Sequence, residues 1–507
     1  MTIAAQAIVP VDLYSEVREE FEALINSVRT AAAGSHVTLG KTITDGVRRI
    51  GGKAYQARLD ELFEQEREST RRWQRPAGSE IRARQRYLET EFGRMIVSRH
   101  GVGVRGQQTR FPLDEELALP AEVYAHTLRE EVALNAVEAS YDRTVARLDR
   151  TMLGHVPKRQ AEQEVERAAV DFNAYYEQRA HEGPANDLLT AQALEVMSVD
   201  GKGVTMRPEG LREATRKEAE AAKENAVRGD PMAARKLRKA DKRMAVVTAN
   251  WEQEPYVRTA GEIVARLGRD PKGRGRTPRP EKAPLPKNKR IAASVVQSTT
   301  EGVESMFAEA QRRNPDGKRR NVVLVDGAKH QIEAVEAEAN KRGMHITIVL
   351  DLIHVIHYLW VIAMLLSADE KKAAEAWIAH TLLQLLTKHP LDVVCAIRQT
   401  ATLRGLSRHD RKALEKAVAY LRKNATRIHY ARFIRDGLPI ATGVIEGACR
   451  HLIQDRLGIT GARWGLAGAE ALLKLRAIHL SGDWDDYWRL HLARERERLY
   501  PVSAATV

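Results

Sequence analysis

The sequence predicts a mainly α-helical protein that contains an α/β core. Near the N-terminus, apolar residues such as Val17, Phe21 and Leu24 recur at the spacing of one helical face. After residue 351 the pattern is again helical, with no strand signal. Between these regions, four runs rich in β-branched residues alternate with helical patterns, which is typical of an α/β sheet. The runs are ALEVMSVDGKGVTM (193–206), RMAVVTANW (243–251), NVVLVDG (321–327) and HITIVLD (345–351).

Composition and charge narrow the class of protein. The chain has 507 residues, 43% of them hydrophobic, and 81 basic against 68 acidic side chains give a net charge of +13. Such a balance favours a polyanionic partner, nucleic acid first, although it also fits a charged helical protein that is basic for solubility. Aromatic residues are only 5% of the chain, which favours a protein that grips duplex phosphates over one that stacks on single-stranded bases.

The sequence also indicates a compartment. The two cysteines, Cys395 and Cys449, are too few for a disulfide framework or a Cys-rich zinc site, which fits a reducing environment. The longest apolar stretch, residues 352–366, is too short to span a bilayer and contains two histidines. The N-terminus lacks the features of a signal peptide. We therefore expect a cytoplasmic protein with no membrane partner.

The N-terminal part of the chain is expected to be helical, with a region at 1–110 and a DNA-binding region at 111–190. Within the second, SYDRTVARLDR (140–150), a short break and a helix over 157–179 predict a helix–turn–helix-like unit. The pattern fits equally well a helical hairpin with a solvated basic end. A recognition helix contacts DNA through its first turns, which here would carry Lys158, Arg159, Gln160 and Gln163.

The α/β region is expected to span residues 191–355 and to contain a flexible basic loop at 266–290. This loop holds ten Lys or Arg, two acids and five prolines, a composition that buries too little apolar area to order itself. Arg274 and Arg276 within it are candidate DNA contacts, although the loop fits equally well a solvated linker.

A helical block is expected to follow at 356–438, inserted before the end of the core at 439–507. In the last region, a helix is predicted from about Thr442 to Leu457, with Gly458 ending it. Two further helices are predicted after it.

Three carboxylates are the candidate catalytic residues. Asp200 and Asp326 end two of the predicted strands, and Glu446 lies among apolar and small residues of the 442–457 helix. Strands of one sheet deliver their carboxyl ends to a common edge, so these acids are expected to converge. Carboxylates that converge need cations between them, and oxygen-only ligation suits two ions of Mg²⁺ or Mn²⁺. Such a pair of ions promotes phosphodiester cleavage and transfer.

Each acid also has a simpler interpretation. An Asp-Gly pair after a strand is often only a turn, because aspartate accepts local backbone hydrogen bonds and glycine adopts positive φ. Glu446 has Arg450 one helical turn later as a partner. The order of the three acids, behind a basic helical N-terminus, favours the catalytic interpretation.

Six segments together resemble a known family, the DDE transposases, and most closely the ISKra family of bacterial insertion-sequence enzymes. The resemblance covers nearly the whole chain. The segments are FPLDEELALP (111–120), VPKRQAEQEVERAAVDFNAYYEQR (156–179), SVDGKGVTMRPEGLREAT (198–215), VVLVDGAKHQ (322–331), VLDLIHVIHYLW (349–360) and GVIEGACRHLIQDRLGITGARWG (443–465).

The resemblance implies a ribonuclease-H-like catalytic core with a helical insertion before the final glutamate, and it assigns the metal-binding roles to Asp200, Asp326 and Glu446. It places Asp351 and His354 in a supporting motif, with Asp351 as the alternative second acid and His354 either supporting the site or packed on its helix. Trp464 either stacks on a displaced base or belongs to the core.

The resemblance further implies an enzyme that binds the terminal inverted repeats of its own element, cuts the 3′ ends and joins them to target DNA. Two ions of Mg²⁺ or Mn²⁺ and a dimer or larger assembly on DNA are expected, in the bacterial nucleoid. Some family members carry N-terminal cysteine pairs that are absent here, so DNA recognition would rest on helices and basic loops. The alternatives are a non-catalytic DNA-binding protein derived from a transposase, or a nuclease of the same fold without strand transfer.

Overall fold

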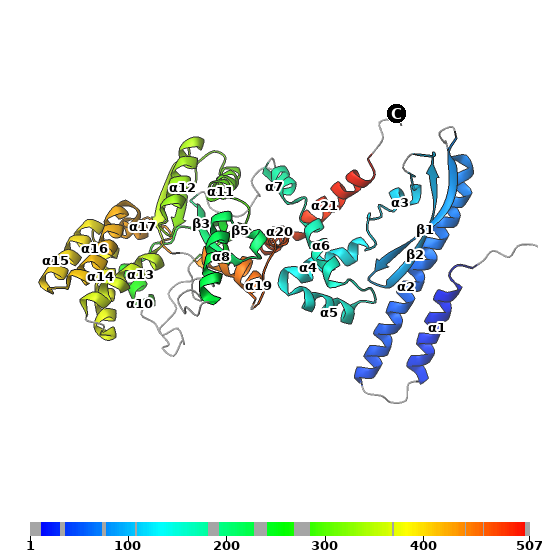
Figure 1. Ribbon diagram of the computed structural model, residues 1–507, viewed down its shortest axis with the longest axis horizontal. Helices are drawn as coiled ribbons and strands as arrows, with labels where there is room; N and C mark the ends of the chain where they lie inside the picture. The colour runs from blue at the N-terminus through cyan, green and yellow to red at the C-terminus, as the bar shows by residue number, and fades with distance from the viewer. Residues whose placement is uncertain are drawn as a thin grey trace, which may run out of the picture. The chain divides into compact units, whose positions relative to one another are not determined.

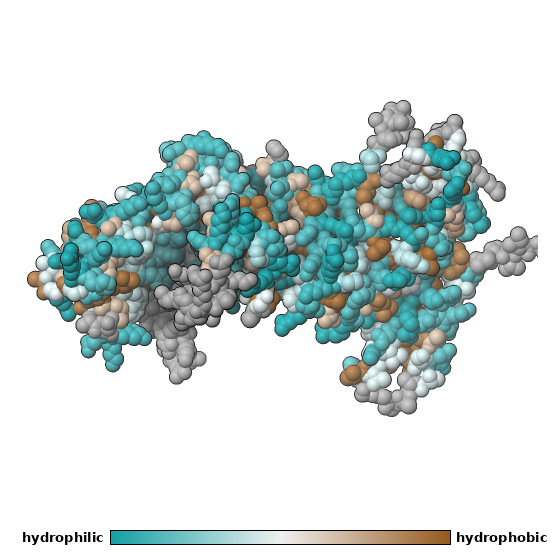
Figure 2. Space-filling view, in the orientation of Figure 1, coloured by the Kyte–Doolittle hydropathy of each residue, from teal (hydrophilic) through white to brown (hydrophobic). Residues whose placement is uncertain are grey.

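The computed structural model shows two compact units, residues 1–171 with 485–507 and residues 172–484, and each is described by itself. The residues that the structure describes are 12–30, 36–73, 78–106, 109–180, 192–227, 241–267, 284–367, 370–441, 443–459 and 461–501. None of the helices in these ranges is both long enough and apolar enough to cross a membrane. Hydrophilic residues cover most of the molecular face shown in Figure 2.

The first unit begins with two helices and a β-hairpin. Helix α1 (Ser15–Thr30) packs along α2 (His36–Ser69), which ends in a 3₁₀ turn, η1 (Thr70–Arg72), and lies beside the hairpin of β1 (Glu80–Thr90) and β2 (Gly93–Gly103) (Figure 1). The Gln56 side chain of α2 pairs with the free edge of β2, since it donates to the Ile96 carbonyl oxygen and accepts from the Ile96 N–H, both at 2.9 Å. A helix thus satisfies part of a strand edge that would otherwise be open.

The expectation that residues 1–110 are helical is therefore wrong for residues 80–103. Leu88, Met95 and Val97 lie on one face of the hairpin and form a buried cluster with Leu59 of α2. This face requires the period-two alternation of a strand. In β1, charged residues alternate with weakly apolar ones. This weak alternation resembles the charged helical patterns on either side, so the sequence did not predict the strand.

The rest of the first unit is helical. It consists of α3 (Pro112–Glu116), α4 (His126–Glu138), α5 (Tyr141–Thr151) and α6 (Lys158–Ala168), together with α21 (Trp484–Leu499) from the far end of the chain. Helices α4, α5 and α6 pack on one another.

The single helix predicted over 157–179 is wrong, because α6 ends at Ala168 and α7 (Phe172–Ala180) follows as a separate helix. Asp171 lies between them and is buried. Its carboxylate accepts hydrogen bonds from Arg498 at 2.7 and 3.0 Å and lies 2.7 Å from the ring of His491. These contacts with α21 hold the chain in the break, where a continuous helix would have passed.

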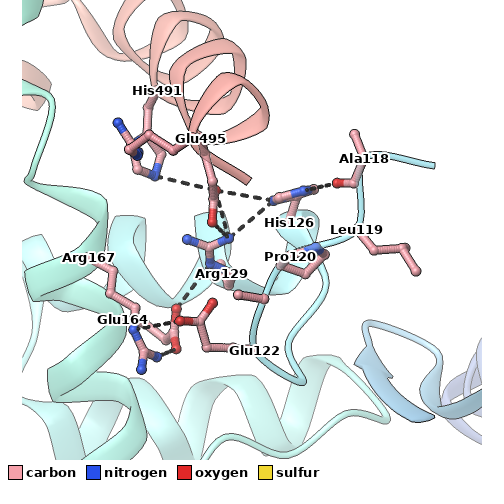
Figure 3. Close-up of polar contacts among 12 residues, drawn as sticks. Ala118, Leu119, Pro120, Glu122, His126, Arg129, Glu164, Arg167, His491 and Glu495 are labelled. Carbon is pink, nitrogen blue, oxygen red and sulfur yellow. Dashed lines mark hydrogen bonds and ion pairs between the residues drawn. The ribbon is translucent and has the colours of Figure 1, made fainter. Parts of the chain in front are cut away.

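A buried ion network joins α4, α6 and α21 (Figure 3). Arg129, only 3% exposed, donates to Glu164 at 3.0 Å and to both carboxylate oxygens of Glu495 at 2.8 and 2.9 Å. Burial raises the pKa of Glu164 and lowers that of His126, which lies beside Arg129. Arg129 is the guanidinium that both buried carboxylates share, and Glu164 also accepts a hydrogen bond from the more exposed Arg167.

The second unit is built on a five-stranded mixed sheet of order β5–β4–β3–β6–β7. Strands β3, β4 and β5 are antiparallel neighbours, and β6 and β7 run parallel to β3 on its other side. The strands are β3 (Leu194–Thr205), β4 (Lys242–Gln253), β5 (Lys287–Ser294), β6 (Asn321–Val325) and β7 (Ile346–Leu350).

The four strands predicted in this unit are confirmed, and β5 is an addition. It begins inside the segment predicted as a loop over 266–290, so that prediction is wrong for 287–290, which pair with β4. Residues 266 and 267 end α10 (Ala260–Leu267). The apolar part of β5 is short, and its first residues are basic, so composition alone masked it. Arg274 and Arg276 lie outside the described residues.

Helices surround this sheet and continue beyond it. Helix α11 packs on β3 and β4, and α12 packs on α11. After β7 the described chain is helical, as predicted. The remaining elements are η2 (Pro208–Gly210), α8 (Glu213–Val227), α11 (Thr299–Arg313), α12 (Lys329–Arg342), α13 (Leu352–Leu366), α14 (Lys371–Thr387), α15 (Pro390–Leu403), α16 (Arg408–Lys423), η3 (Ala425–Ile428), α17 (Tyr430–Arg435), α18 (Gly443–Ala448), the π-helical segment η4 (Cys449–Gln454), α19 (Asp455–Leu457) and α20 (Leu466–Ser481).

Removing the Arg129 guanidinium is expected to destabilise the first unit. In Arg129→Met, Glu495 keeps its place in the interior without its cation, so we expect a loss of about 3–5 kcal/mol in the free energy of unfolding. Urea unfolding followed by circular dichroism measures it. Arg167→Met is the matched control, because Arg167 also bonds to Glu164 but its side chain is 37% exposed; it should cost about 1 kcal/mol or less. Equal stability of both variants would contradict the role given to Arg129.

The fully buried Glu195 of β3 predicts a pH dependence of stability. Burial, and then Glu252 directly opposite on β4, raise the pKa of Glu195 from 4.5 to about 8. The folded protein therefore holds the neutral acid, and this contribution to stability, complete below pH 4.5, is lost as the pH rises through about 8. Glu195→Gln should lose less stability than wild type between about pH 5 and pH 8 in urea titrations. Parallel pH profiles would contradict this assignment.

Candidate active site

Three aspartates lie side by side at the carboxyl end of the parallel strands. The last paired residues are Val199 of β3 with Val325 of β6, and Val325 with Leu350 of β7. The residues that follow these in the chain are Asp200, Asp326 and Asp351. Because the strands are parallel and in this register, the three acids lie at the same level on three adjacent strands.

Asp200 differs from expectation in one respect. It does not end its strand, because β3 continues to Thr205 in antiparallel pairing with β4. What ends at Asp200 is the pairing with β6. The acid therefore stands where β3 runs past its parallel neighbour, and one side of its backbone is released from the sheet. Residues 201–203, which predict a turn by their glycines, remain extended because β4 is long enough to pair with them.

Local hydrogen bonds orient the carboxylates of Asp200 and Asp326, which are both half-buried. The N–H of Gly201 donates to Oδ1 of Asp200 at 2.6 Å, and the N–H of Ala328 donates to Oδ1 of Asp326 at 2.7 Å. Within the described chain, Oδ2 of Asp326 accepts no hydrogen bond. Asp326 thus has the local turn bond that the simpler interpretation predicts, and it still keeps one carboxylate oxygen for another ligand.

Asp351 has a structural task. Its side chain is buried and caps the N-terminus of α13, where it accepts a hydrogen bond from the N–H of Ile353 at 2.7 Å. An N-cap aspartate satisfies one of the unpaired donors of the first helical turn. His354 lies one turn into the same helix, half-buried, with its ring centroid 6.0 Å from that of His357.

Glu446 lies on α18, which packs on β3, the strand that carries Asp200, and on β4. The side chain is exposed. Cys449, three residues after Glu446, has a buried thiol that donates to Oδ2 of Asp200 at 3.3 Å. Burial raises the pKa of this thiol strongly, and the charges of Asp200 and then Glu446 add to the effect. Both acids therefore lie close enough to Cys449 to act on it electrostatically.

The predicted helix over 442–457 is present from Gly443 to Leu457, but its middle is a π-helix, Cys449–Gln454. A π turn is wider than an α turn and leaves carbonyl groups poorly satisfied, and such turns are frequent at functional sites. Here the buried Arg476 of α20 donates to the carbonyl oxygens of His451 and of Leu452, the latter at 3.0 Å. Arg476 thus stabilises the π segment that carries Cys449.

The helical block between β7 and α18 contacts the same edge through two tyrosines. The Tyr420 hydroxyl donates to the Asp326 carbonyl oxygen at 3.0 Å, and the buried Tyr430 hydroxyl donates to the Leu350 carbonyl oxygen at 2.8 Å. Gly327 makes the approach of Tyr420 possible, because its φ is +92° and a Cβ there would collide with the hydroxyl. The block therefore fixes the backbone just where β6 and β7 end.

The acids have the donor chemistry for a hard cation, since their carboxylate oxygens suit Mg²⁺ or Mn²⁺. Among the residues that the structure describes, however, no three His, Cys, Asp or Glu side chains lie close enough together to hold a metal ion as they stand. The structure brings Asp200 next to Asp326 by register and places Glu446 near Asp200, without joining all three in one cluster.

The remaining candidates have other surroundings. Trp464 is buried, and its indole N–H donates to the Leu457 carbonyl oxygen at 3.1 Å, so it occupies the core position that was its second interpretation. In the first unit, Lys158 and Arg159 are exposed at the start of α6, and Lys158 forms an ion pair with Asp142 at 2.9 Å. Gln160 and Gln163 are half-buried on the same helix.

Sequence reasoning missed Cys449, Tyr420 and Arg476. Cys449 follows Glu446 by three residues, so the helical period could have placed both near one face. Tyr420 and Arg476 had no such signal, because their contacts span long separations in the chain. A scan against models of known protein families matched none, and a search of curated proteins found no similar sequence.

Replacing Gly327 is expected to disturb this edge of the sheet. Gly327→Ala should lose roughly 1–2 kcal/mol of stability for its positive φ, plus the cost of displacing Tyr420. Gly343→Ala is the matched control, since Gly343 also has positive φ (+62°) but a Cβ there meets no atom within 4 Å. Thermal unfolding should show a larger loss of stability for Gly327→Ala than for Gly343→Ala. Adding Tyr420→Phe to Gly327→Ala removes the hydroxyl that the Cβ meets, so it should make the two losses more similar. Equal losses at the two glycines would contradict the close approach of Tyr420.

Proposed function

We propose that the protein is a DDE transposase of a bacterial insertion sequence, of the ISKra type. It would bind the terminal inverted repeats of its element, cleave the DNA strands at the ends and transfer them to target DNA. The observation that carries the proposal is the parallel register of β3 and β6, which sets Asp200 beside Asp326, while α18, which carries Glu446, packs on β3 and β4. These are the acids, in the chain order, that the six-segment resemblance assigns to catalysis.

The sheet supports the ribonuclease-H-like core that belongs to this proposal. Two antiparallel strands follow the first strand on one side, and two parallel strands lie on its other side, in the order β5–β4–β3–β6–β7. In such a fold the first acid stands on the central strand and the second at the end of the adjacent parallel strand. The helical block between β7 and α18 takes the place of the insertion before the glutamate.

In this proposal Asp200, Asp326 and Glu446 would hold two ions of Mg²⁺ or Mn²⁺. Such ions, when bound, make a water or a 3′-hydroxyl more nucleophilic and stabilise the leaving oxygen. The chain's own groups orient the acids. The N–H groups of Gly201 and Ala328 fix one oxygen of each aspartate, and the Cys449 thiol holds the second oxygen of Asp200.

The thiol also bears on how the site would be prepared. The Cys449 thiol occupies one of the two lone pairs of Oδ2 of Asp200 and leaves the other for a cation. Glu446 is exposed, and the three acids do not form one cluster within the described residues, so in this proposal Glu446 would move toward the two aspartates when DNA binds.

DNA binding and assembly follow from the same proposal. The net charge of +13 favours a polyanionic partner. Lys158 and Arg159 are exposed at the start of α6, where a recognition helix makes its contacts. Pairing two ends of one element calls for at least a dimer on DNA. The protein would act in the cytoplasm, on the nucleoid.

The test is transposition in cells of a marked mini-element that carries the natural flanks of the gene. Asp326→Asn removes a proposed catalytic charge at constant shape and should lower transposition by roughly 100-fold or more, the size of effect seen when one transition-state-stabilising group is lost. Asp351→Asn is the matched control, because asparagine caps helices about as well as aspartate. It should keep most of the activity.

Other outcomes of this experiment separate the alternatives. If only Asp351→Asn is inactive, the second catalytic acid is Asp351. If wild type cleaves the element ends in vitro but produces no joined product, a nuclease of the same fold replaces the transposase. If wild type binds the ends and neither cleaves nor moves them, a non-catalytic DNA-binding protein is the better description.

A further inference from the structure

The open end of the β1–β2 hairpin carries three exposed arginines, Arg82, Arg84 and Arg105, of which Arg82 forms an ion pair with Glu80. The buried cluster of the hairpin lies toward its turn, at Leu88, Met95 and Val97. Toward the open end, Arg82 and Arg84 project from the same face of β1 as Leu88, and both are exposed. Arg105, which follows β2, is exposed beside them.

These arginines line a hollow of about 520 Å³. Gly101 and Gly103 of β2 line the hollow, and Thr109 passes close to both glycines. Val102, between them, pairs with Arg110. The hollow is open and its charge is positive, since Glu80 is the one acid among its lining residues in the described chain. The lining residues are Gly78, Glu80, Arg82, Arg84, Gly101, Gly103, Val104, Arg105, Gly106 and Thr109.

Among the arginines that line the hollow, Arg84 has no polar contact that would stabilise the fold within the described residues. It lies directly opposite Arg99 in the register of the hairpin. Arg99 is compensated by the buried Asp114, with which it forms a salt bridge, whereas Arg84 has no ion pair or hydrogen bond within the described residues. The charge of Arg84 is therefore left for a partner, and an anion from outside the chain would compensate it.

We propose that the outer end of this hairpin binds the phosphate backbone of duplex DNA, as a second DNA contact of the first unit besides α6. The inference rests on the proposed function, and it names a β-ribbon where the sequence indicated only helices and loops. A two-stranded ribbon is narrow enough to enter the major groove. Arginine forks match phosphate oxygens in pairs, and phosphate contacts dominate the affinity of proteins for DNA.

The test compares the salt dependence of DNA binding by full-length variants. Fluorescence anisotropy with a labelled duplex carrying the element end gives the binding constant between about 50 and 200 mM salt. A plot of log K against log salt has a negative slope, and each lost phosphate contact makes it shallower by about 0.9. The double variant Arg82→Ala/Arg84→Ala should therefore make the slope shallower by about 1.8. Arg29→Ala/Arg496→Ala removes the same charge from exposed sites of the same unit outside the hollow, and should keep the slope.

The remaining outcomes each decide the proposal. Arg82→Lys/Arg84→Lys should recover most of the slope, since lysine also binds phosphate. The proposal is overturned if the alanine variant keeps the wild-type slope, or if the control variant loses as much. Equal thermal unfolding of the two alanine variants excludes misfolding as the cause. Cleavage of the element ends by wild type, measured in the same preparation, tests the proposed function separately. If wild type cleaves DNA while the alanine variant of the hairpin keeps the wild-type slope, the inference about the hairpin is wrong and the proposed function stands.

Discussion

The parallel pairing of β3, β6 and β7 is the constraint on which the candidate site depends. Each strand ends its pairing at the same level, so Asp200, Asp326 and Asp351 stand next to one another although more than a hundred residues separate the first from the second. A one-residue slip in any of the three strands would turn one acid to the opposite face of the sheet. In β3 the buried Val199 opposes such a slip, because the slip would exchange it with Ser198 or Asp200.

The surrounding helices act on the ends of these strands. Tyr420 and Tyr430 hold the backbone after β6 and β7, and Asp351 begins α13 with its own side chain. On the other side, Arg476 supports the π segment that presents Cys449 to Asp200. The backbone at this edge of the sheet is therefore held by side chains from several helices. Glu446, the third proposed acid, lies on α18 and is exposed.

The first unit has a different source of order, which is buried charge. Arg129 joins α4, α6 and α21, and Asp171 joins the end of α6 to α21. Both contacts connect residues from the two ends of the chain, so the C-terminal helix is part of the N-terminal unit. Arginines that form buried ion pairs within the protein are unavailable to a binding partner. Arg84, which has no ion pair or hydrogen bond within the described residues, is for this reason more informative about binding.

The sequence by itself determined four of the five strands of the second unit and the position of Asp326 and Asp351 directly after two of them, because short β-branched runs that end in an acid are a local signal. It missed β5, and it did not show that β3 continues past Asp200 to Thr205. It also indicated the helix that carries Glu446 and its end at Gly458. It failed on the β1–β2 hairpin, where charged residues concealed the alternation, and on the break at Asp171, which depends on arginines in α21. Strand order, register, the π turn and the contact of Cys449 with Asp200 were decided only by the tertiary structure. The physical reason is that periodicity records which face of an element is buried, whereas the partner that buries it is set by contacts between residues far apart in the chain.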